Sequence, residues 1–320
     1  MKKTAEQSAR KKTRKIIIPP AIQKGDTIGL VSPAGPLVNK SNFTAGINIL
    51  EKKGFKTKYN RRLLHTKGYL AGADHARAHE FNRLWADPEV KALVATRGGY
   101  GCLRMLDFLE MKLIRKKPKI FVGFSDLTVL LAAINKKTGL VTYHGPVITT
   151  LATSDRKSQK SFLATLTDST ISDIDAAKVK VLKGGKARGV LLGGNLTTLV
   201  HMIATPYEIP WDQAILFIED IGEFPYRLDR LLTHLDQAGR LQKIRGLILG
   251  TFSDNDRKEN RAMKNAVQKR VLELLEKKDI PIWANFPTGH SRRNLTLPIG
   301  VYFAMNSSDR SLRPLANHDS

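Results

Sequence analysis

Between residues 27 and 145, short apolar runs alternate with stretches in which apolar residues recur every three or four positions. Short apolar runs are typical of buried strands, and the helical spacing between them is typical of amphipathic helices. The pattern predicts strands at 27–31, 91–95, 119–122 and 140–142. It predicts helices at 42–53, 74–85, 103–111 and 127–135. Strands and helices in alternation indicate a parallel α/β sheet, in which sites form beyond the carboxyl ends of the strands.

The second half of the chain resumes this alternation. It predicts strands at 179–181, 189–192, 215–218 and 246–249, with a strand-like run at 282–284. Helices are expected at 196–204, 226–238 and 262–276. The end of the chain, residues 307–320, is polar and is predicted to be frayed.

Residues 148–178 are rich in Ser, Thr and Asp and have only weak periodicity, which is typical of a connection between domains. A chain of 320 residues is also long for a single core. We therefore expect a flexible basic arm at residues 1–20, an N-terminal α/β domain at 21–150, an interdomain linker at 151–180 and a C-terminal domain at 181–320.

The net charge of +24 is the strongest anomaly of composition and favours acidic partners. Residues 1–20 contribute seven positive charges and one negative, so the remainder still carries +18. The excess is therefore spread over the chain, without the stripe or the aromatic interleaving that is typical of nucleic-acid binding. A solvated basic surface is the preferred interpretation, and nucleic acid is not an expected partner.

Localisation is predicted from what the sequence lacks. It has no run of eighteen apolar residues, so no membrane span is expected. The apolar segment Ile16–Ile18 is too short for a secretory signal. The single cysteine, Cys102, cannot form an intramolecular disulfide and fits a reducing compartment. We expect a cytoplasmic protein.

Three distant segments each place a chemically capable side chain after an apolar run: Gly123–Asp126, Leu216–Asp220 and Thr288–His290. Ser, acid and His in this order can form a nucleophile, an orienting carboxylate and a base. Ser125 is expected at a strand-to-helix corner, where backbone N–H groups, including that of Asp126, would face a developing oxyanion. A serine that only caps the helix is the alternative.

Other polar groups leave alternatives open. The loop Arg97–Gly101 carries three glycines and could approach a ligand closely, bind a phosphate or form a structural turn. Glu219, Asp220 and Glu223 could form an acid–base pair, bind a divalent cation or, for Glu223, supply charge at a helix N-terminus. A histidine partner would select among these carboxylates, and His290 is the best candidate.

Taken together, these segments resemble the LD-carboxypeptidase family of serine peptidases. These are the muramoyltetrapeptide carboxypeptidases, and the family also includes the microcin-C self-immunity proteins. The resemblance spans residues 22–301 and rests on segments that occur in order: Gly25–Thr27 with Ser32–Ala34, Arg97–Gly101, Gly123–Asp126, Gly193–Leu196, Glu219–Asp220 and Gly289–His290.

The resemblance implies a two-domain enzyme. Its N-terminal domain would be a Rossmann-like or flavodoxin-like parallel sheet, and its C-terminal domain a β-rich α+β unit resembling a swivelling β-barrel. Ser125 would be the nucleophile, His290 the general base and Glu219 the carboxylate that orients it. The backbone N–H groups of Asp126, Gly98 and Gly99 would hold the oxyanion. The family is usually homodimeric and uses no metal or other cofactor.

The activity that the resemblance implies is removal of the terminal D-alanine from peptidoglycan stem tetrapeptides, by hydrolysis of an L,D amide bond through an acyl-enzyme. The microcin-immunity members carry a tryptophan-bearing loop near the interdomain connection, and residues 148–186 contain no tryptophan. This favours the peptidoglycan branch over hydrolysis of a peptidyl-nucleotide. A non-catalytic protein that binds anionic ligands or nucleic acid is the alternative from another class, and the basic arm is not part of the family pattern.

Overall fold

The apolar runs of the first half pair as a parallel sheet in the computed structural model, which describes residues 16–254 and 261–315. The strands are β1 (Thr27–Val31), β2 (Lys56–Lys58), β3 (Val90–Ala95), β4 (Ile120–Gly123) and β5 (Thr142–His144). Their spatial order is β2-β1-β3-β4-β5, which is the flavodoxin-like order. The parallel α/β fold predicted for this half is confirmed.

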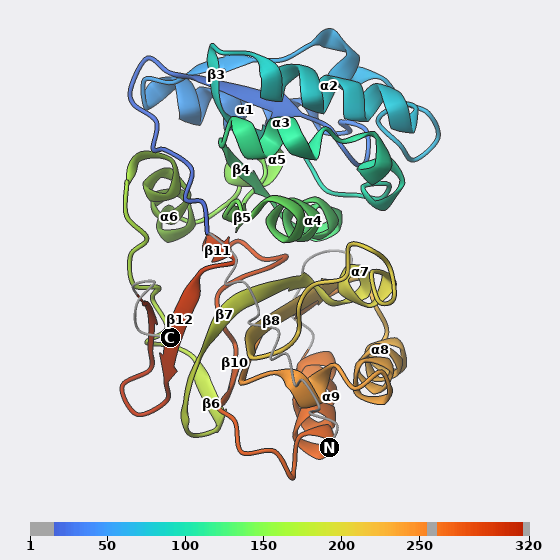
Figure 1. Cartoon of the computed structure of the whole chain (residues 1–320), viewed down its shortest axis with the longest axis vertical. Coiled ribbons are helices and arrows are strands. Elements are labelled where there is room, and N and C mark those ends of the chain that lie inside the picture. The colour runs from blue at the N-terminus through green and yellow to red at the C-terminus, as the bar shows by residue number, and fades with distance from the viewer. Residues whose placement is uncertain (1–15, 255–260, 316–320) are drawn as a thin grey trace, which may run out of the picture.

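Helices cover this sheet on its faces (Figure 1). They are α1 (Lys40–Lys52), α2 (Asp74–Ala86), α3 (Met111–Lys116), α4 (Thr128–Thr138) and α5 (Ile148–Leu151). The helix predicted at 103–111 is instead a 3-10 segment at Leu103–Phe108, followed by α3. Aromatic rings anchor α2 to the sheet, since the Phe81 ring stacks on Trp85 and meets Phe121 of β4 edge-on at a centroid distance of 5.2 Å.

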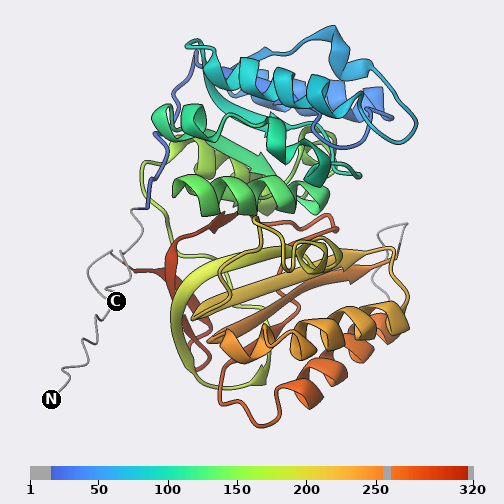
Figure 2. The same ribbon diagram turned by 45° about the vertical axis from the view of Figure 1, so that its right-hand side comes forward.

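The second half forms a curved mixed sheet with the order β13-β12-β7-β8-β9-β10-β6 (Figure 2). Its parallel strands are β7 (Lys186–Asn195), β8 (Ala214–Ile221), β9 (Gly246–Ser253) and β10 (Ile282–Ala284). The antiparallel strands at its edges are β6 (Lys180–Lys183), β12 (Tyr302–Asn306) and β13 (Ser311–Pro314). The connecting helices are α7 (Leu196–His201), α8 (Pro225–Gln237) and α9 (Arg261–Leu274).

Two strands near the C-terminus differ from the prediction. β13 pairs with β12, so the expectation of a frayed end is wrong for residues 311–314. β11 (Leu297–Ile299) runs antiparallel to β5 and completes the first sheet, although residues 181–320 were assigned to the second domain. Both segments are too short to show periodicity, and Pro298 argues against a strand except at a sheet edge, where β11 lies.

The segments predicted as arm and linker also contain ordered structure. Residues 1–15 of the arm lie outside the described residues. Ile17 forms a β-bridge with Leu140, and its N–H donates to the carbonyl of Gly139 at 2.9 Å. The linker contains α6 (Arg156–Thr167), whose Phe162 and Leu166 are fully buried. None of the helices within the described residues is long and apolar enough to cross a membrane.

Asn135 ties α4 to β11 and provides a test of this junction. Its buried amide nitrogen donates to the carbonyls of Leu140 at 2.9 Å and of Ile299 at 3.2 Å. Asn135→Leu removes both donors inside the core. We expect it to lower the free energy of unfolding by about 2 kcal/mol or more, because a buried carbonyl without a partner costs about 1–3 kcal/mol.

Chemical denaturation measures this loss. The exposed Arg156→Ala on α6 is the control and should change stability by less than about 0.5 kcal/mol. A stability of Asn135→Leu equal to that of the control would contradict a structural role for the junction.

Candidate active site

Ser125 lies where β4 ends and a helical segment begins. Residues 125–127 form a 3-10 turn that continues into α4, so Ser125 and Asp126 are in the first turn, whose N–H groups have no acceptor within the helix. Ser125 has φ +65°, a left-handed conformation that costs a non-glycine residue free energy and is concentrated at functional sites. Its side chain is half-buried, so the hydroxyl remains accessible.

The glycine loop after β3 lies directly against Ser125. A Cβ atom built on Gly98 would be 2.8 Å from the Ser125 Cβ and 2.9 Å from its Oγ, so only glycine fits there. Gly99 has φ +127° and faces Gly35 instead, since its Cβ would be 2.8 Å from the Gly35 nitrogen. The structure therefore brings Gly98 to the serine side chain and Gly99 to the neighbouring loop.

A buried cation holds the glycine loop in place. Arg77 of α2 donates hydrogen bonds to the carbonyls of Pro33 and of Gly101, the latter at 3.0 Å. The carboxylate of Asp126 accepts from the backbone N–H of Cys102 at 2.8 Å. These bonds fix both sides of the Ser125 corner. Burial raises the pKa of the Cys102 thiol well above its ordinary value, so the thiol stays protonated in the core.

Glu219 and His290 form the central contact of the second half. The Nδ1 atom of His290 lies 2.6 Å from Oε2 of Glu219, and both side chains are buried, with 6% and 0% exposed. Burial acts to raise the pKa of Glu219, but the charge and hydrogen bond of His290 outweigh it, so the pKa is lowered. With Nδ1–H donating to this carboxylate, Nε2 is the ring atom left to act as a base.

Glycine residues allow the His290 loop to lie on Glu219. Gly289 has φ +108°, and a Cβ there would be 2.7 Å from Oε2 of Glu219. A Cβ on Gly250 of β9 would be 2.7 Å from the Thr288 carbonyl oxygen and 3.2 Å from the Glu219 Cβ. A side chain at either position would displace the loop that carries the histidine.

The two halves meet at Phe124. Its ring lies 4.7 Å, centroid to centroid, from the His290 imidazole, so the residue before Ser125 packs directly against the histidine. The structure therefore brings together the segments that carry Ser125, His290 and Glu219. Among residues 16–254 and 261–315, nothing accepts or donates a hydrogen bond at the Ser125 hydroxyl, a looser geometry that is common before substrate binds.

The His290 loop is held on its other side by α6. The N–H groups of Asn294 and Thr296 donate to the hydroxyls of Ser158 at 2.9 Å and Ser161 at 3.1 Å. Arg293 pairs with Asp155, the N-cap residue of α6, at 2.6 Å. The segment predicted as a linker thus positions a predicted catalytic loop, and two serines three residues apart on a polar helix face were the signal for it.

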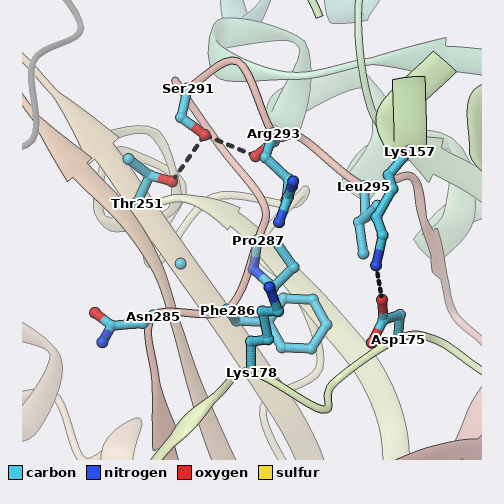
Figure 3. Close-up of a pocket in the computed structure, with 11 residues that line it drawn as sticks. Lys157, Asp175, Lys178, Thr251, Asn285, Phe286, Pro287, Ser291, Arg293 and Leu295 are labelled. Carbon is cyan, nitrogen blue, oxygen red and sulfur yellow. Dashed lines mark hydrogen bonds and ion pairs between the residues drawn. The ribbon is translucent and has the colours of Figure 1, made fainter. Parts of the chain in front are cut away.

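A cavity of about 170 Å³ lies beside this loop (Figure 3). Ser291 donates to the carbonyl of Arg293 at 2.6 Å and lies 3.4 Å from the Thr251 hydroxyl, while Lys157 pairs with Asp175 at 2.9 Å. The lining is therefore of mixed charge, and most of its charged groups are paired.

Asp220 is buried, and its hydrogen-bond partners differ from those of the adjacent Glu219. Its carboxylate accepts from the Asn195 amide at 2.8 Å and from the Thr197 N–H at 2.9 Å, while the Asn195 N–H donates to Thr128 of α4 at 3.0 Å. Burial and the like charge of Glu219 raise the pKa of Asp220 to about 6. This network joins the Glu219 strand to the helix that follows Ser125, and the position of Thr128 in an apolar helix gave no signal of it.

The structure thus separates the three candidate carboxylates. Glu219 bonds to His290, Asp220 bonds to Asn195 and Thr197, and Glu223 pairs with Arg227 at 3.7 Å at the start of α8. In the described part of the chain, no group of three or more His, Cys, Asp or Glu side chains is arranged to hold a metal ion.

Comparison with known proteins identifies the family of both halves of the chain. Residues 28–145 match the LD-carboxypeptidase N-terminal domain, and residues 188–305 match the LD-carboxypeptidase C-terminal domain. The chain is 36% identical over 301 residues to the probable murein peptide carboxypeptidase of Bacillus subtilis (strain 168), which covers 92% of each chain.

Solved structures give the same result. The microcin C7 self-immunity protein MccF, in complex with aspartyl sulfamoyl adenosine, superposes with a TM-score of 0.84 at 28% identity, over 95% of this chain and all of that one. The muramoyltetrapeptide carboxypeptidase from Oxalobacter formigenes gives a TM-score of 0.75 at 31% identity, over 90% and 97% of the two chains. The chain belongs to the LD-carboxypeptidase family.

Proposed function

We propose that the protein is a serine carboxypeptidase that releases the terminal D-alanine from peptidoglycan stem tetrapeptides. The observation that carries this proposal is the buried 2.6 Å contact between Glu219 and His290, with the Ser125 segment packed against the same imidazole through Phe124. The names of the relatives from Bacillus subtilis and Oxalobacter formigenes support the choice of substrate.

In the proposed mechanism, Nε2 of His290 takes the hydroxyl proton as Oγ of Ser125 attacks the amide carbonyl. The backbone N–H groups of Asp126 and of Gly98, the glycine that packs against Ser125, stabilise the resulting oxyanion. Glu219 stabilises the imidazolium, which then protonates the nitrogen of the departing D-alanine. Water, deprotonated by His290, then attacks the acyl-enzyme. The imidazolium returns that proton to Oγ of Ser125 as the ester bond breaks, and the shortened peptide leaves as a carboxylate, with its remaining proton released to solvent.

Charge supports an anionic substrate. Stem peptides carry several carboxylates, and a protein with a net charge of +24 attracts them over distances set by the ionic strength. We further propose that the enzyme acts in the cytoplasm as a homodimer, on the family resemblance and on a single cysteine, Cys102, that is buried as a free thiol.

Hydrolysis of a peptidyl-nucleotide is the second candidate, because the structural match to MccF with aspartyl sulfamoyl adenosine is as extensive as any reported above. That ligand would need a platform for its base. Residues 148–186, the region where the family resemblance puts the stacking tryptophan, contain none. The stem peptide is therefore the preferred substrate.

Ser125→Ala tests the nucleophile. This change keeps the Cβ atom and the backbone strain but removes the attacking oxygen, so we expect release of D-alanine from a stem tetrapeptide to fall by about 10⁴-fold or more. Amino-acid analysis of the released D-alanine measures it. Ser308→Ala, which removes an exposed hydroxyl from the loop between β12 and β13, is the control and should retain full activity. Near-normal turnover by Ser125→Ala would end the assignment.

Substrate choice is tested by presenting one preparation with the stem tetrapeptide and with aspartyl sulfamoyl adenosine. We expect kcat/KM for the tetrapeptide to exceed that for the nucleotide conjugate by at least about 10-fold, since a base without a stacking partner forgoes roughly 1–3 kcal/mol. A preference for the nucleotide conjugate would move the protein to the microcin-immunity branch and leave the Ser125 assignment intact.

A further inference from the structure

A second histidine, His144, lies close to the proposed Ser125–His290–Glu219 relay and takes no part in the mechanism above. His144 ends β5, where its backbone pairs with Gly123 of β4 on one side and with Leu297 of β11 on the other. Its side chain is 0% exposed. Within the described residues, neither nitrogen of its ring has a hydrogen-bond partner. A buried imidazole without hydrogen-bond partners lowers the stability of the fold, so its presence here needs an explanation.

Its neighbours are those of the relay. The His144 ring meets the rings of Phe124 and Phe217 edge-on, at centroid distances of 5.9 and 5.0 Å. Phe124 is the same residue that packs against His290. Phe217 precedes Glu219 by two residues on β8, so their side chains point to the same face of the sheet. His144 therefore lies beside the buried end of Glu219.

Glu219 has an unpaired acceptor oxygen on the same side. Oε2 is occupied by His290, but Oε1 is buried and finds no partner within the described residues. A buried polar atom left unpaired destabilises the folded protein. A small rotation of the His144 ring or the Glu219 carboxylate, or one buried water between them, would pair these groups by a hydrogen bond.

The charge state of His144 fits this arrangement. Burial lowers its pKa to about 4; the Glu219 charge opposes this shift and His290 adds to it. Near neutral pH the ring is uncharged, with one N–H donor and one acceptor nitrogen. The N–H matches the unpaired Glu219 oxygen. A neutral ring also leaves the Glu219 charge to stabilise His290.

We propose that His144 is a positioning residue for Glu219. Its neutral imidazole donates to Oε1, directly or through one buried water, so that Oε2 stays directed at Nδ1 of His290. The proposal deepens the proposed function, since the kinetic consequence requires the Ser125–His290–Glu219 relay. Its geometric part concerns only His144, Glu219 and His290 and is measurable without a substrate.

The test compares His144→Phe with His144→Gln. Phenylalanine preserves the ring packing on Phe124 and Phe217 but supplies no donor, whereas glutamine supplies an N–H and an acceptor. We expect His144→Phe to lower kcat by about 10- to 100-fold, the usual effect of removing a partner that orients a functional group, with KM unchanged. His144→Gln should recover a large part of kcat. The exposed His201→Gln is the control and should match wild type.

A second readout needs no turnover. The proton shared by His290 Nδ1 and Glu219 gives a far-downfield resonance in the proton NMR spectrum of the resting enzyme. We expect this resonance to shift or broaden in His144→Phe and to return toward the wild-type position in His144→Gln. Wild-type kcat and an unchanged resonance in His144→Phe would overturn the proposal. Equal losses in both variants, together with equal falls in Tm, would also overturn it, by showing a purely structural role.

The two proposals fail separately. If the protein does not release D-alanine from any stem peptide, the proposed function fails, but the resonance still reports whether His144 holds Glu219.

Discussion

The hydrogen bond between Glu219 and His290 is the interaction on which the rest of the site depends. A carboxylate that is 0% exposed requires a partner, and His290 supplies both a donor and an opposite charge when protonated. Much of the surrounding structure serves this contact. Gly250 and Gly289 let the loop approach Glu219, Ser158 and Ser161 of α6 fix the far side of that loop, and Asp220 directs its own bonds elsewhere.

The proposed nucleophile comes from the other half of the chain, so the two halves must be held in register. Three kinds of contact do this: β11 adds to the first sheet, Asn135 bonds to the Ile299 carbonyl, and Thr128 accepts from Asn195. The Asn195–Thr128 bond lies close to the strand ends that carry Ser125 and Glu219, whereas Asn135 holds the far end of α4. A stable junction between the halves is therefore a condition for any chemistry that combines them, and it explains why buried polar groups gather at this boundary.

Much of this could be predicted from the sequence, because buried strands and helices of five residues or more give clear periodicity. Ser125, Glu219 and His290 each lie in or after an apolar run, and Ser125 has a left-handed φ of +65°. Short or contact-dependent features could not be predicted. β11 has three residues, α6 looks like a polar linker until Phe162 is seen to be buried, and His144 resembles any histidine at a strand end.

The relay is tested most directly by covalent labelling of Ser125 with a serine-directed fluorophosphonate, followed by peptide mass spectrometry, because this needs no knowledge of the natural substrate. The account predicts an adduct on Ser125, formed roughly 10²-fold or more slowly in His290→Ala and in Glu219→Gln than in wild type. An adduct on another residue, or labelling of Ser125 at the same rate in all three proteins, would contradict it.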